Sequence, residues 1–85
     1  MISMGKVICV FRLMPKEPAA FDELKAKAER LGPAKMDEEP IAFGLKALKL
    51  SFVIDDAGGT FEKLEKKLEG LGAESVENIM TTRSL

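Results

Sequence analysis

The spacing of apolar residues changes repeatedly along this chain, and this change limits the folds that it can adopt. Some segments alternate apolar and polar residues, as half-buried strands do, and two others repeat apolar residues every three or four positions, as amphipathic helices do. The predicted strands are Lys6–Leu13, Ala34–Gly44, Leu45–Ile54 and Glu74–Thr82, and the predicted helices run over Ala19–Leu31 and from Thr60 to about Leu71. Right-handed crossovers fold this β-α-β-β-α-β order into an α+β, ferredoxin-like sandwich, with a four-stranded antiparallel sheet and both helices on one face.

The strand patterns also predict which residues face the core. The inward rows of the first and third strands are Val7, Cys9, Phe11 and Leu13, and Leu48, Leu50, Phe52 and Ile54. We expect these two strands to be central. Pro40 lacks the N–H that a central ladder needs, so the second strand is predicted at an edge or irregular there. Val76 and Ile79 do not alternate cleanly, which is compatible with a β-bulge in the last strand.

The helix patterns are clearer than those of the strands. One apolar stripe carries Phe21, Leu24, Ala28 and Leu31, and the second carries Phe61, Leu64, Leu68 and Leu71. Gly32-Pro33 is expected to end the first helix. Asp55–Gly59 is predicted to be a turn, and the Thr60 hydroxyl is expected to cap the second helix.

The size of the chain predicts a single domain over residues 1–85, because cores rarely divide in chains this short. Residues 1–4 are expected to be either disordered or an alternative start at Met4, because Met1–Ser3 add nothing to any pattern. The 13 basic and 14 acidic residues are nearly balanced, which argues against a dedicated nucleic-acid or anionic-membrane binder. The chain is also expected to be cytoplasmic, with neither a signal peptide nor a membrane span.

Residues that could support catalysis are few. The sequence has no histidine, and its lone Cys9 can form neither an internal disulfide nor a CxxC pair. Asp37, Glu38 and Glu39 are adjacent on an extended segment, so they should point to opposite faces and form a solvated edge rather than a carboxylate site. Asp55–Thr60 lacks the lysine of a phosphate-binding loop. No cofactor and no metal are therefore expected.

Two other functions known for this architecture fit these patterns poorly. Acylphosphatases share the topology, but the segment after the first strand, Met14–Pro18, has no glycine for a phosphate-binding loop. Sheets of this kind also bind RNA through aromatic residues on their open face. Phe11 and Phe52 lie on the central strands, but both fall in the rows predicted to face the core.

The segment Pro40–Leu45 is apolar at a junction where polar turn residues are usual. Gly44 allows unusual backbone geometry after Phe43. Phe43 could project from one end of the domain as an anchor for a protein partner, or fold back to close the end of the core. The pattern alone leaves both alternatives open.

Three stretches resemble the elongation factor 1-beta family, and in particular its archaeal branch. They are PIAFGLKAL at residues 40–48, FVIDDAGGTFEKLEKKLEGL at 52–71 and GKVICVFRLMP at 5–15, so the resemblance covers about Gly5 to Arg83. It implies a guanine nucleotide exchange factor without bond-making chemistry, which promotes GDP release from, and GTP reloading of, the GTPase elongation factor 1-alpha. It implies no direct nucleic acid, membrane or small-molecule substrate.

The resemblance also implies a partner-binding site. Phe43 would insert into the GTPase, Ala42 and Gly44 would flank it, and Lys46 would lie on the following strand. Eukaryotic relatives carry a lysine near the chain end that disturbs the magnesium site. This chain has no such lysine. Arg83 could take over the cationic role as a further partner contact, although a planar guanidinium is not equivalent to an ammonium, or it could be a solvated charge of the tail. The alternative function is a ferredoxin-like regulatory or RNA-associated binding module without exchange activity.

Overall fold

The computed structural model describes residues 5–42, 44–55 and 59–84, and of residues 83 and 84 only the backbone. Its strands are β1 (Lys6–Met14), β2 (Lys35–Pro40), β3 (Lys46–Asp55) and β4 (Ser75–Ser84), and its helices are α1 (Phe21–Glu29), preceded by a 3-10 turn at Pro18–Ala20, and α2 (Thr60–Glu69). The predicted order of elements is confirmed. No helix in these described ranges is long and apolar enough to cross a membrane.

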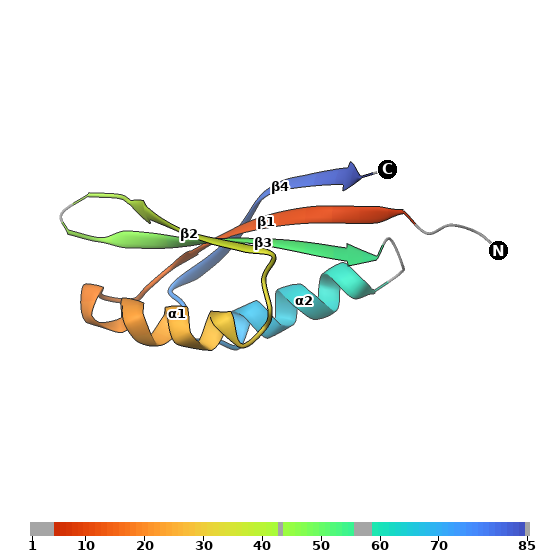
Figure 1. Cartoon of the computed structure of the whole chain (residues 1–85). Coiled ribbons are helices and arrows are strands. Elements are labelled where there is room, and N and C mark those ends of the chain that lie inside the picture. Colours follow the sequence, from red (N-terminus) through yellow and green to blue (C-terminus); the bar gives the residue numbers. More distant parts are fainter. Residues whose placement is uncertain (1–4, 43, 56–58, 85) are drawn as a thin grey trace.

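The four strands form one antiparallel sheet in the order β2-β3-β1-β4. Both helices lie on the same face of this sheet and leave the other face open (Figure 1). The α+β, ferredoxin-like architecture is therefore confirmed, with β1 and β3 in the centre and the proline-containing β2 at an edge.

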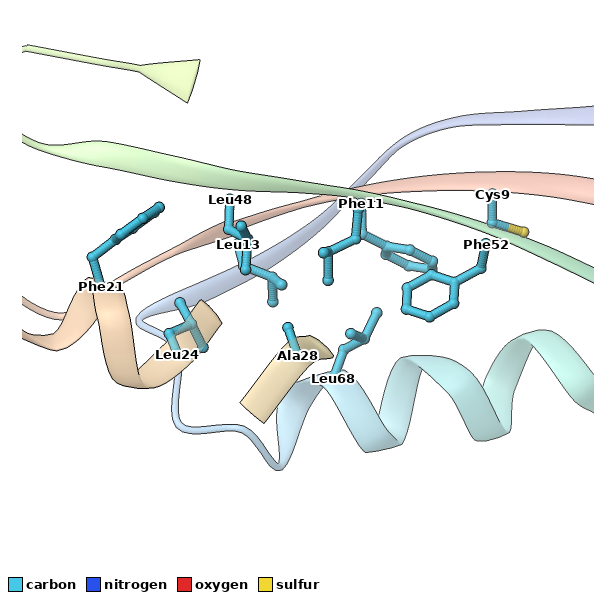
Figure 2. Packing of buried hydrophobic residues seen from close by; sticks show 10 residues of the cluster. Cys9, Phe11, Leu13, Phe21, Leu24, Ala28, Leu48, Phe52 and Leu68 are labelled. Atoms are coloured by element: carbon cyan, nitrogen blue, oxygen red, sulfur yellow. The ribbon is translucent and has the colours of Figure 1, made fainter. Parts of the chain in front are cut away.

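The core lies between the sheet and the helices (Figure 2). The Phe11 ring on β1 meets Phe52 on β3 edge-on at 6.4 Å and stacks on Phe61 of α2 at 5.6 Å between ring centroids. Phe11 is fully buried and Phe52 is 4% exposed, so both central aromatic residues belong to the core. Neither is available as a stacking platform for bases on the open face. The buried cluster comprises Cys9, Phe11, Leu13, Phe21, Leu24, Ala28, Leu48, Leu50, Phe52 and Leu68.

On the open face, an arginine links the two edges of the sheet. Arg12 on β1 donates to Glu39 on β2 at 3.0 Å and to Glu77 on β4 at 3.3 Å. Ala47 of β3, the register partner of Glu39, is fully buried, and its small side chain leaves room for Arg12 to cross the strand. The acidic residues of β2 are thus divided between faces, as predicted, because Glu38 bonds to Lys25 of α1 instead.

Several boundaries differ from the predictions. The first helix was predicted over Ala19–Leu31, but α1 is only Phe21–Glu29. Its last turn closes through 3-10-type bonds from Leu31 to Ala28 and from Gly32 to Glu29, and Gly32 then has a positive φ of 74°. The second strand ends at Pro40 rather than Gly44, because Ile41–Leu45 form a turn. Asp55 belongs to β3 and not to the predicted turn Asp55–Gly59, and residues 56–58 of that turn lie outside the described residues.

The predicted cap of the second helix is wrong. Thr60 is the first helical residue of α2, and Gly59 occupies the N-cap position with a φ of 86° and without a side-chain hydrogen bond. Only glycine adopts this left-handed conformation readily. The N-cap is therefore Gly59, one residue before the predicted Thr60, because the backbone at this position needs a left-handed conformation.

The β-bulge in the last strand is confirmed. The register between β1 and β4 shifts between Val10 and Phe11, so that Ile79 is the extra residue. The Asn78 side-chain amide donates to the backbone oxygens of Val10, at 3.1 Å, and of Met80, at 3.2 Å. Asn78 thereby satisfies a strand carbonyl at the point where the ladder is interrupted.

Candidate functional site

A tight turn connects β2 to β3. The Ile41 N–H donates to the Leu45 oxygen, and the Leu45 N–H donates to the Ala42 oxygen, both at 2.9 Å. Gly44 is the third residue of the four-residue turn that the Leu45–Ala42 bond closes, and it has a φ of 79°, which L-residues with a side chain rarely adopt. A side-chain carbon built on Gly44 would meet no atom within 4 Å. Conformation rather than space therefore requires glycine here.

The described residues of this turn present apolar surface at one end of the molecule. Ile41 is 46% exposed, and Ala42 and Gly44 are exposed as well, whereas Leu45 is half-buried. Phe43 lies outside the described residues, so both of its predicted orientations remain predictions. We call Ile41–Leu45 the hairpin turn. It lies beyond the start of α1 at the end of the sheet (Figure 1).

Lys46 is the first residue of β3 and lies at the base of the hairpin turn. Its ammonium group is 5.0 Å from the centre of the Phe21 ring, within the range of a cation–π contact. It also donates to a carboxylate oxygen of Glu38 on β2 at 3.3 Å. The other oxygen of Glu38 accepts from Lys25 of α1 at 2.8 Å. One carboxylate thus holds two ammonium groups beside the turn.

These contacts change the acidity of the groups involved. The hydrogen bond from Lys25, followed by that from Lys46, lowers the pKa of Glu38 below its ordinary value. The same bond to Glu38 raises the pKa of Lys25. Both shifts favour the charged forms of Glu38 and Lys25, so this pair stays ionised at neutral pH.

Arg83 is not brought to this place. Its backbone in β4 pairs with Val7 near the start of β1, whereas the hairpin turn lies beyond the opposite end of β3 (Figure 1). The longest dimension of the molecule is 50 Å. The structure thus brings Ala42, Gly44 and Lys46 together and places Arg83 at the other end of the sheet.

The chain was compared with known proteins. Residues 9–83 match the EF-1 guanine nucleotide exchange domain. The chain belongs to this family. It is 43% identical to elongation factor 1-beta of Methanoregula boonei, in an alignment that covers 93% of this chain and 98% of that protein. The elongation factor 1-beta proteins of Methanobrevibacter smithii and Methanothermobacter thermautotrophicus are 39% and 40% identical, over 96% and 93% of this chain and 99% and 93% of their own lengths.

Membership of the EF-1 guanine nucleotide exchange family confirms the resemblance seen in the sequence and places the chain among the archaeal exchange factors of translation elongation. All five predicted site residues, Ala42, Phe43, Gly44, Lys46 and Arg83, fall within the matched range. The roles of these residues remain predictions.

Lys25, Glu38 and Lys46 form a charged cluster beside the hairpin turn, and sequence reasoning missed two of its members, Lys25 and Glu38. Lys25 lies 13 positions before Glu38 and on a different element, and no local pattern relates the two residues. Glu38 was assigned to a solvated edge, where it partly belongs, since its side chain is 39% exposed. The only available signal was the inward parity of Glu38 and Lys46 on paired strands, which puts both on the helix side of the sheet. In the described ranges, no group of three or more metal-ligating side chains could hold a metal ion.

Proposed function

We propose that this chain is a nucleotide exchange factor for elongation factor 1-alpha, and that the hairpin turn is its principal contact. In this proposal it binds the GTPase loaded with GDP, weakens the hold on GDP and allows GTP to enter, without making or breaking a covalent bond. It works in the cytoplasm, as translation elongation does. The relatives named above support the assignment by their shared name, elongation factor 1-beta.

The observation that carries the proposal is the composition of one end of the molecule. An exposed apolar turn stands beside two ammonium groups that are fixed by one carboxylate. A protein partner with an apolar pocket and an acidic rim is the kind of surface that this arrangement fits, because interfaces combine apolar anchors with charged surroundings. Both the apolar turn and the ammonium groups favour binding of a partner, and the proposal assigns no chemical step to either.

Each predicted residue has a role in this proposal. Phe43 is the anchor that enters the GTPase, Ala42 adds contact area beside it, and Gly44 gives the turn its shape. Lys46 steers the approach and pairs with acidic groups of the partner. Arg83 cannot act at the same point, since it lies at the other end of the sheet, and we assign it to a second contact with the same GTPase.

The physical basis of exchange is reciprocal coupling between two ligands. A partner that lowers the affinity of the GTPase for GDP must itself bind the GDP-loaded form less tightly by the same factor. Binding energy at the hairpin turn is therefore used to favour a form of the GTPase that holds nucleotide weakly. Contact residues are sufficient for this task.

Release of a fluorescent GDP analogue from elongation factor 1-alpha tests the proposal. We expect the chain to accelerate release, and Phe43→Ala to reduce the acceleration about tenfold or more, as the loss of a central aromatic anchor does. Met80→Ala is the matched control, because Met80 is 51% exposed on the open face and its truncation also removes exposed apolar surface. Circular dichroism confirms that each variant folds.

The outcomes separate the function from the site. No acceleration by the unaltered chain contradicts the exchange function. Equal acceleration by the unaltered chain and Phe43→Ala keeps the function and contradicts the assignment of Phe43 as the anchor. Loss of acceleration in Met80→Ala but not in Phe43→Ala would place the contact on the open face of the sheet instead.

A further inference from the structure

A groove lies on the helix side of the sheet, along the second half of β3. It has a volume of about 440 Å³. Its wall on the sheet is Phe52–Ile54, its floor on α2 is formed by Thr60, Lys63, Leu64 and Lys67, and Leu31 and Gly32 close it where α1 ends. The four residues of α2 follow helical spacing, so one side of this helix faces the groove. The hairpin turn, at the other end of β3, has no part in it.

The groove exists because neither α1 nor β2 extends along the second half of β3. The helix α1 ends at Glu29, and β2 begins only at Lys35, which pairs with Ser51. Ala34 makes the last backbone bond to this edge, to the oxygen of Ser51 at 2.7 Å. β3 itself continues to Asp55. Its last four residues therefore have β1 on one side and no strand on the other within the described part of the chain.

This uncovered edge presents backbone groups for pairing. Alternate residues of a strand direct their N–H and C=O groups to the same edge. Because the Ser51 oxygen points toward β2, the N–H and C=O of Val53 point in the same direction, where β2 has not yet begun. The Val53 side chain is 53% exposed. An uncovered strand edge of this kind is a template for an added strand.

The charges and the apolar surface at the groove specify what such a strand would carry. Both charged residues that line it, Lys63 and Lys67, are lysines, and Leu31, Phe52, Ile54 and Leu64 supply the apolar lining. Asp55, at the end of this edge, forms an ion pair with Lys6 of β1. The field at the groove thus favours an anionic ligand with an aliphatic side chain.

We propose that this groove binds an extended acidic peptide segment of a partner protein, which adds to β3 as an edge strand. Its backbone pairs with Val53, an aliphatic side chain enters the groove, and its carboxylates meet Lys63 and Lys67. This proposal does not rest on the exchange function, because it requires neither the GTPase nor the hairpin turn. It gives the domain a second interaction surface, through which it can be tethered to another protein.

The test uses the complete chain and a fluorescein-labelled synthetic peptide of sequence Asp-Val-Ile-Val-Asp, with binding followed by fluorescence anisotropy at low salt. We expect saturable binding, and slower hydrogen exchange of the Val53 amide in the complex. Lys67→Glu should weaken binding about threefold or more, as the loss and reversal of an exposed charge pair does. Lys66→Glu is the matched control, because it has the same charge change on the same helix but does not line the groove.

A second pair of peptides tests the backbone contact. In one, the first and third peptide residues carry N-methyl groups, and in the other, the second and fourth do. Only alternate N–H groups of an added strand point to β3, so one of the two peptides should lose binding and the other should retain it. Absence of binding, equal weakening by Lys66→Glu and Lys67→Glu, or equal binding of both methylated peptides would overturn the proposal.

Discussion

At the scale of single residues, Gly44 sets the conformation of the hairpin turn and Glu38 organises the charges beside it. Gly44 has a left-handed backbone, and Glu38 joins Lys25 and Lys46 beside the turn. Sequence reasoning identified Gly44 from its place after an aromatic residue, and Lys46 from the resemblance to the elongation factor 1-beta family. It missed the link through Glu38, because that contact joins side chains of two different elements, α1 and β2, that are brought together only in the folded chain.

Replacement of Gly44 should destabilise the fold through backbone strain. Gly44→Ala places a side-chain carbon on a residue with a φ of 79°, which costs about 1–2 kcal/mol for an L-residue. Unfolding in urea, followed by circular dichroism, measures this cost.

Gly70→Ala provides the comparison for this prediction. Gly70 has a φ of −75° and would accept a side-chain carbon in ordinary contact at 3.5 Å, so this change should be nearly neutral. Equal loss of stability in the two variants would show that strain at Gly44 is not the cause.

At the scale of elements, periodicity predicted the type and order of each helix and strand, but it failed at their ends. The first helix was predicted to extend to Leu31, because its apolar stripe continues past the end of α1. There a 3-10 turn keeps Leu31 packed against the core. The N-cap was placed at Thr60, although Gly59 holds it. Ends depend on backbone conformations such as the positive φ of Gly32 and Gly59, which the spacing of apolar residues does not encode.

The bulge in β4 depends on one side chain. Asn78 donates to the oxygens of Val10 and Met80 and accepts from the hydroxyl of Thr81 at 3.0 Å. Asn78→Ala leaves the Val10 oxygen without this partner and should lower the free energy of unfolding by about 1 kcal/mol. Chemical denaturation measures the change.

Two further variants provide the comparison for Asn78→Ala. Asn78→Asp keeps the size of the side chain but has no N–H donor, so it should lose about as much stability as Asn78→Ala. Thr82→Ala changes an exposed residue of the same strand and gives the background. A loss of stability in Asn78→Ala no greater than that background would mean that the hydrogen bonds of the Asn78 side chain do not stabilise the bulge.

At the scale of the whole molecule, the sheet separates three surfaces. The hairpin turn lies at one end, Arg83 pairs near the other, and the groove follows the second half of β3. The sequence resemblance named residues of both ends as partner contacts, but a motif does not give the distance between them. The register of β1 with β3 and β4 shows that the two ends are separated along the length of the strands.

The central claim is that binding of this chain and binding of GDP to the GTPase oppose each other. The most direct measurement is the affinity of the chain for elongation factor 1-alpha without nucleotide and with GDP, by isothermal titration calorimetry. Linkage predicts tighter binding to the nucleotide-free form, by the same factor by which the chain weakens GDP binding in a separate titration. Equal affinity for the two forms would contradict the account, because a partner that does not distinguish them cannot shift nucleotide binding.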